Sequence, residues 1–124
     1  MTQTTGVILF AHGSRDPLWR LPIDAVAEHM RGQQTSMPVA VAFLELTEPD
    51  LPSAVEALMK QDVAHVRILP MFLGVGRHAR EDLPALMAAL QAEHPEVRFE
   101  LMRPAGEDER LTALLAELAL EDRA

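Results

Sequence analysis

Four short apolar runs alternate along the chain with four segments in which apolar residues recur at helical spacing. The runs span residues 6–11, 38–44, 66–69 and 97–102. The first is continuously apolar, as in a strand buried on both faces, whereas the fourth is more polar and is expected at a sheet edge. A strand followed by a helix, four times over, predicts a parallel sheet with right-handed crossovers and helices on both faces. We therefore expect an α/β three-layer sandwich.

We expect one domain over residues 1–124, with four strands in the order 2-1-3-4 of a flavodoxin-like sheet. The first helix is predicted from an N-cap at Asp16 with proline next, and Pro22 either kinks it or marks a later start. The third strand is expected to end before Pro70, because proline cannot donate within a ladder. In the final helix Leu120 lies off the apolar stripe. That stripe consists of Leu111, Leu114, Leu115 and Leu118.

Composition excludes several functions. Nineteen acids against 11 lysines and arginines give a net charge of −8, which is unsuited to gripping nucleic acid. Residues 106–124 hold half of that charge, which favours a solvated helix face. Cysteine is absent, so disulfides and thiolate metal sites are excluded. No apolar run reaches the roughly 18 residues of a membrane span, and the first five residues lack the basic start of a signal peptide. We expect a cytoplasmic protein that acts on a small molecule, with no membrane or nucleic-acid partner.

Three potential metal ligands follow three of the predicted strands. His12 follows the first strand, Glu45 ends the second and His78 comes after the third. Ligands of parallel sheets bind beyond the carboxyl ends of the strands, so these side chains are expected to converge on one cleft. Two imidazoles and a carboxylate suit a divalent metal and leave coordination positions open for a substrate. Taken singly, either histidine could be a hydrogen-bonded structural group, and Glu45 an N-cap or a surface charge.

Arginines gather near the same histidines. Arg15, Arg77 and Arg80 are expected to make the mouth of the cleft locally positive. Such a mouth suits a substrate with several carboxylates, because arginine binds carboxylates in a bidentate manner. The alternative is that each arginine is solvated and paired with a neighbouring acid such as Glu81.

A glycine-rich loop precedes the third helix. Residues 74–79 match the loose dinucleotide pattern G-x-G-x-x-A, but the match follows the third strand instead of the first. We favour glycines that let this loop fold tightly over a cleft. No phosphate-binding loop G-x-x-x-x-G-K-[ST] occurs, so a nucleotide-binding flavodoxin-like module is disfavoured and no nucleotide is expected.

The chain resembles a known family at its strand ends. The segments AHGSRDP at residues 11–17, FLE at 43–45 and PMFL at 70–73, with Gly76, His78 and the DLP of residues 82–84, look like the motifs of class II tetrapyrrole chelatases. The small single-domain sirohydrochlorin chelatases are the nearest type, and the resemblance covers essentially the whole chain. It implies a chelatase-like fold in which His12 and His78 handle the metal and Glu45 is the acidic partner.

The resemblance implies ATP-independent insertion of Co²⁺, Fe²⁺ or Ni²⁺ into sirohydrochlorin, in cobalamin or siroheme biosynthesis. The residues agree, since a neutral histidine can accept a pyrrole proton and an incomplete ligand set can release a metal. A non-catalytic carrier of metal or tetrapyrrole using the same cleft is the alternative. Larger members of the family carry two such domains, so we expect this chain to pair as a homodimer. Leu120 could supply apolar surface for that pairing, or could be a tolerated exposed residue.

Overall fold

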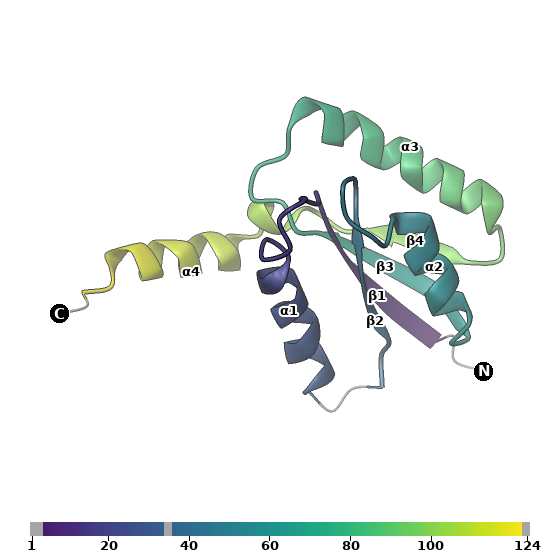
Figure 1. Ribbon diagram of the computed structural model, residues 1–124, viewed down its shortest axis with the longest axis horizontal. Coiled ribbons are helices and arrows are strands. Elements are labelled where there is room, and N and C mark those ends of the chain that lie inside the picture. Colours follow the sequence, from purple (N-terminus) through teal and green to yellow (C-terminus); the bar gives the residue numbers. More distant parts are fainter. Residues whose placement is uncertain (1–3, 34–35, 123–124) are drawn as a thin grey trace.

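The computed structural model describes residues 4–33 and 36–122 and shows a four-stranded sheet with helices on both faces (Figure 1). The strands pair in the order β2-β1-β3-β4, and every pairing is parallel. The predicted α/β class and strand order are confirmed. The elements are β1 (Thr4–Ala11), α1 (Leu21–Arg31), β2 (Val39–Phe43), α2 (Leu51–Met59), β3 (Val63–Pro70), α3 (Arg77–Glu93), β4 (Arg98–Leu101), the 3-10 helix η1 (Ala105–Glu107) and α4 (Glu109–Leu120).

The central strand β1 sends its side chains into two separate cores. Ile8 and Phe10 pack on one side among residues of α2 and α3. Val7 and Leu9 pack on the other side with Ile23 of α1. This alternation is that of a strand buried on both faces, as the continuous apolar run predicts. The more polar β4 lies at the edge of the sheet, also as predicted.

Helix α1 begins later than the Asp-Pro pair at residues 16–17 predicts. Pro22 occupies its first turn, where the missing backbone N–H costs no helical hydrogen bond. Asp16 instead caps a turn, in which its Oδ1 accepts the N–H of Leu18 at 2.9 Å. Of the two interpretations of Pro22, the later helix start is therefore the correct one.

Strand β3 is longer than predicted. It begins at Val63 and includes Pro70 as its last residue, where β1 still lies alongside it. His65 directly precedes the predicted run of residues 66–69 but lies within β3, at the end of the sheet opposite the predicted cleft. Its Nε2 lies 3.2 Å from Oε1 of Glu100 on β4.

Helix α4 does not pack on the sheet: α1 covers one face, and α2 and α3 cover the other. It projects away from the body of the molecule (Figure 1), and none of its residues is buried. Three of the four leucines of the stripe are exposed with it: Leu114 is 49%, Leu115 41% and Leu118 51% exposed. On the α1 side, β3 and β4 are left without a helix among the described residues. No helix in the described ranges combines the length and hydrophobicity that crossing a bilayer requires.

Candidate functional site

Backbone hydrogen bonds join three loops at the carboxyl edge of the sheet. The N–H of Glu45, after β2, donates to the carbonyl of His12, after β1, at 2.9 Å. The N–H of Met71, after β3, donates to the carbonyl of Phe10 at 2.7 Å. The ladder of the sheet thus continues past the strand ends. It holds the loops after β1, β2 and β3 in one rigid edge, as the topology predicted.

The imidazole of His12 is held in place by an aromatic ring. It stacks on Phe72 of the β3–α3 loop, with ring centroids 4.4 Å apart and an interplanar angle of 29°. Phe72 is itself buried and packs on Phe10 of β1, with centroids 6.2 Å apart. His12 nevertheless remains exposed. The result is a solvent-accessible imidazole on a fixed support, as a group that meets a substrate must be.

Gly13 lets the first two loops approach each other. Its φ of +104° is one that L side chains rarely adopt, and a Cβ there would lie 1.7 Å from the carbonyl oxygen of Glu45. Next to it, Thr47 Oγ1 accepts the N–H of Ser14 at 2.9 Å and donates to the Ser14 carbonyl at 2.7 Å. His12 and Glu45 are therefore brought together through their backbones, and the Glu45 side chain is exposed beside them.

His78 is not gathered into a metal site with the other two. It lies exposed in the first turn of α3, just after the N-cap Gly76. Within residues 4–33 and 36–122, no group of three or more His, Asp or Glu side chains could hold a metal ion. The ligand set of His12, Glu45 and His78 is thus not preassembled, and the metal-handling role of these residues stays a prediction.

The three predicted arginines differ in their surroundings. Arg77 pairs with Glu81 one turn along α3, Nε to Oε1 at 3.3 Å. Arg77 is therefore a solvated arginine paired with a neighbouring acid, which is the alternative to a role at the mouth of the cleft. Arg15, in the β1–α1 loop, and Arg80, in α3, are exposed and make no ion pair within the described part of the chain. These two guanidinium groups remain available to carboxylates of a substrate.

The glycines of the β3–α3 loop are not required by the fold, and the tight-loop interpretation is wrong. A Cβ at Gly74 or Gly76 would meet nothing within 4 Å, and neither residue has a positive φ. Gly76 is the N-cap of α3 with an extended backbone.

Sequence reasoning gave no positioning role to Phe72 or Thr47. Phe72 stands in the PMFL segment at residues 70–73, and its place beneath His12 becomes visible only when β1 and β3 are side by side. Thr47 follows Glu45 by two residues and had no signal beyond its hydroxyl. Both contacts are non-local, which is why a one-dimensional pattern does not reveal them.

The CbiX family model matches residues 6–122, nearly the whole sequence. The chain belongs to the CbiX family.

Solved CbiX relatives share the fold. A CbiX protein from Marinobacter aquaeolei has 35% identity and a TM-score of 0.82, with 93% of each chain covered. The sirohydrochlorin chelatase SirB from Bacillus subtilis subspecies spizizenii, solved in complex with cobalt, has 28% identity and a TM-score of 0.77. The match covers 94% of this chain and 50% of that one.

Curated relatives differ in length. The chain is 31% identical to the sirohydrochlorin ferrochelatase of Bacillus subtilis over 106 residues, which is 85% of this chain and 40% of that protein. It is 25% identical to the sirohydrochlorin cobaltochelatase of Methanosarcina barkeri over 122 residues, covering 93% of this chain and 94% of that protein. The chain therefore spans less than half of the Bacillus enzyme and nearly all of the Methanosarcina one.

Proposed function

We propose that this chain inserts a divalent metal ion, Co²⁺ or Fe²⁺, into sirohydrochlorin without ATP, in cobalamin or siroheme biosynthesis. The observation that carries the proposal is the exposed imidazole of His12, fixed on Phe72 and joined through its backbone to Glu45. It lies at the ligand-binding edge of a CbiX-family chain. The names of the curated relatives, ferrochelatase and cobaltochelatase, support the substrate and the two metals.

The reaction needs a proton acceptor and a temporary metal ligand. The free macrocycle loses two pyrrole N–H protons, and its four ring nitrogens take up one M²⁺ in their place. A neutral imidazole can accept such a proton or donate a lone pair to the metal, and His12 is exposed for either task. The carboxylate of Glu45 can attract the cation to the same edge or orient an imidazole.

Among the described residues, His12, Glu45 and His78 do not form a closed ligand set, which fits delivery of a metal better than its storage. A closed four-ligand site would retain its metal, whereas a site with few protein ligands can pass the metal to the nitrogens of the ring. His78, in the first turn of α3, is the second imidazole of the proposal, and the substrate brings the remaining donors. The incoming macrocycle thus completes the coordination that the protein alone does not provide.

Arginine side chains supply the proposed contacts to the substrate. Sirohydrochlorin carries several carboxylates around its rim, and guanidinium groups form paired, charge-assisted hydrogen bonds with carboxylates. Arg15 lies in the β1–α1 loop and Arg80 lies in α3, and neither has a competing ion pair in the described ranges. Arg77 already forms an ion pair with Glu81, so we assign it a smaller contribution to substrate binding.

We further propose that the working unit is a homodimer. A tetrapyrrole is a broad disc, and one four-stranded domain offers one wall of a cleft. A second copy related by a two-fold axis supplies another wall most simply. The exposed Leu114, Leu115 and Leu118 of α4 support such an association, because contiguous exposed apolar side chains often mark a protein–protein contact.

The test is a turnover assay with purified protein, metal-free sirohydrochlorin and Co²⁺ or Fe²⁺ under anaerobic conditions without ATP. A chelatase yields many equivalents of metallated product per chain above the uncatalysed background. A carrier of metal or tetrapyrrole binds one equivalent and adds nothing to the rate, and that result would reject the proposed function. Running both metals in competition then assigns the preferred one.

A further inference from the structure

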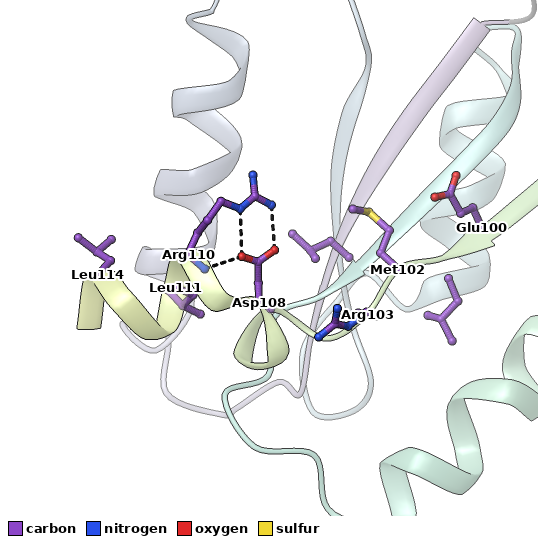
Figure 2. Close-up of a pocket in the computed structure, with 10 residues that line it drawn as sticks. Glu100, Met102, Arg103, Asp108, Arg110, Leu111 and Leu114 are labelled. Atoms are coloured by element: carbon purple, nitrogen blue, oxygen red, sulfur yellow. Dashed lines mark hydrogen bonds and ion pairs between the residues drawn. The ribbon is translucent and has the colours of Figure 1, made fainter. Parts of the chain in front are cut away.

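Leucines that are more than half exposed occur in two places in the described part of the chain. One is the C-terminal helix α4, which also borders an open groove of about 710 Å³. Figure 2 shows this groove, with Met102 on one side and Leu111 and Leu114 of α4 on the other. None of the three predicted metal ligands lines the groove, so this surface lies outside the candidate site. The other place is the carboxyl edge of the sheet.

The carboxyl edge carries an exposed leucine in each of three neighbouring loops. Leu18 lies in the β1–α1 loop, Leu46 in the β2–α2 loop and Leu73 in the β3–α3 loop, and they are 68%, 54% and 70% exposed. Leu21, the first residue of α1, is exposed as well. A single exposed leucine is ordinary, but several together at a ligand-binding edge indicate a surface that binds something apolar.

Leu46 has a backbone conformation that leucine rarely adopts. Its φ is +64°, and the N–H of Thr47 donates to the carbonyl of Glu45 at 2.8 Å. A hydrogen bond between residues two apart closes a γ-turn, and the form with a positive φ at its centre is the rare and strained one. Glycine and asparagine occupy such a backbone more readily than leucine does. The chain thus keeps an exposed leucine at a position where the backbone favours other residues.

Hydrogen bonds on both sides of Leu46 hold it beside the loop of His12. Before it, the N–H of Glu45 donates to the carbonyl of His12 at 2.9 Å. After it, Thr47 Oγ1 accepts the N–H of Ser14 at 2.9 Å and donates to the carbonyl of Ser14 at 2.7 Å. The exposure of Leu46 is therefore not that of a loose loop, because the residues before and after it are fastened to the β1–α1 loop.

The backbone of Leu73 is fixed as well. Leu73 follows Phe72, the ring on which the imidazole of His12 stacks. The N–H of Gly106 in η1 donates to the carbonyl of Phe72 at 2.9 Å. A Cβ at Gly106 would lie 1.8 Å from the carbonyl oxygen of Leu73, so η1 rests directly on this loop. Because β2 and β3 lie on either side of β1, Leu46 and Leu73 come from the two loops next to that of His12.

The fold does not account for these two leucines. A side chain that is more than half exposed adds little to the core, and a rare backbone conformation persists where the residue has another task. The proposed substrate has two broad faces of conjugated ring atoms and carries its charges at the rim. Apolar contacts on a face would complement guanidinium contacts at the rim, as in most small-molecule sites. A free metal ion gains nothing from an apolar contact.

We propose that Leu46 and Leu73 bind a face of the tetrapyrrole beside His12, and that they set the affinity for the macrocycle but not for the metal. The inference rests on the proposed function and names residues that determine its substrate specificity. Covering the exposed part of one leucine with an apolar surface strengthens binding about tenfold. The strained backbone at Leu46 lets this role be separated from a structural one, because a polar residue that tolerates a positive φ can replace it.

Titration with metal-free sirohydrochlorin, followed by the absorbance of the tetrapyrrole, measures its Kd without any turnover. Leu46→Asn should raise that Kd about tenfold without lowering the melting temperature, because asparagine tolerates the positive φ and is polar. Leu73→Asn should weaken binding to a similar degree. Leu46→Met keeps an apolar side chain and should bind within about twofold of wild type. Equal Kd values for wild type and Leu46→Asn, or the same loss in Leu46→Met, would overturn the proposal.

Asp62→Gly is the matched control for the backbone. Asp62 is the other described non-glycine residue with a positive φ, +62°, and it lies in the turn before β3, at the opposite edge of the sheet. Its substitution should leave the Kd of sirohydrochlorin unchanged. In initial-rate measurements, Leu46→Asn should raise KM for sirohydrochlorin about tenfold and leave KM for Co²⁺ unchanged. An equal rise in both values would mean that the substitution disturbs the loop of His12, and would contradict a role in binding the macrocycle.

The two proposals fail in different ways. A wild-type protein that binds sirohydrochlorin without inserting a metal would reject the chelatase proposal, and the Kd values of the variants would still decide the role of the leucines. Normal turnover with an unchanged Kd in Leu46→Asn would reject the leucine contacts alone. A wild-type protein that does not bind sirohydrochlorin would overturn both.

Discussion

Gly13→Ala should strongly reduce the rate of metal insertion while leaving the chain folded. A methyl group at residue 13 would lie 1.7 Å from the carbonyl oxygen of Glu45. Ordinary contact begins at about 3.5 Å, so the first two loops must separate by roughly 1.8 Å. The 2.9 Å hydrogen bond from Glu45 to the carbonyl of His12 cannot survive that movement. The positive φ and the lost hydrogen bond together cost about 2–3 kcal/mol, less than the stability of a typical domain.

The catalytic effect follows from the same displacement. A misplacement of about 1 Å can reduce an enzymatic rate about 100-fold, so metal insertion by Gly13→Ala should fall by at least that factor. The assay is the initial rate of Co²⁺ insertion into sirohydrochlorin, beside a thermal melt of the same sample. Gly32→Ala is the matched control, because its Cβ would meet the nearest atoms at an ordinary 3.6 Å, far from the site at the end of α1. A Gly13→Ala rate close to wild type would refute the role given to this backbone contact.

His78→Ala should abolish insertion with an unchanged melting temperature, because the side chain is exposed in the first turn of α3; a near-normal rate would exclude it from the site. Arg80→Glu should raise KM about tenfold at low salt with a smaller change in kcat. Arg77→Glu should raise KM less, because Arg77 already pairs with Glu81. Equal increases in KM for the two variants would contradict the smaller role of Arg77. Asp50→Ala removes the N-cap of α2 and should lower the melting temperature by about 4 °C at pH 7. Hydrogen bonds from the first turn of α2 lower the pKa of Asp50 in the folded state, so this stabilisation is present above the ordinary carboxyl value of 3.8 and is lost in acid. The melting temperatures of wild type and Asp50→Ala should therefore converge as the pH falls below that value. A difference in melting temperature that does not change with pH would contradict the stabilisation of α2 by the ionised Asp50 carboxylate.

The architecture was predictable because strands and helices have different apolar periods. The continuous run at residues 6–11 identified the central strand, and the polar character of residues 97–102 identified the edge strand. The rule for parallel sheets places the candidate site at the carboxyl edge, where the backbones of His12 and Glu45 are hydrogen-bonded. The sequence alone does not decide the role of Pro22, because a proline inside a helical apolar pattern fits either a kink in the helix or a later start of the helix.

The position of α4 could not be predicted from its sequence. The spacing of the leucines at 111, 114, 115 and 118 indicates that one face of the helix packs on another apolar surface. The spacing is the same whether that surface belongs to the same chain or to a second one. The direction of the helix depends on the contact of Gly106 with the backbone at Phe72 and Leu73, residues far away in the sequence. The support of His12 by Phe72 is hidden for the same reason.

The central claim is that the imidazole of His12, held on Phe72 at the carboxyl edge, takes part in metal insertion. The most direct measurement is the rate of Co²⁺ insertion by His12→Ala at saturating sirohydrochlorin, with the wild-type protein and a protein-free blank measured alongside. We expect the rate of the variant to fall to that of the blank while its melting temperature stays within a few degrees of wild type. A folded His12→Ala protein that inserts the metal at close to the wild-type rate would contradict it.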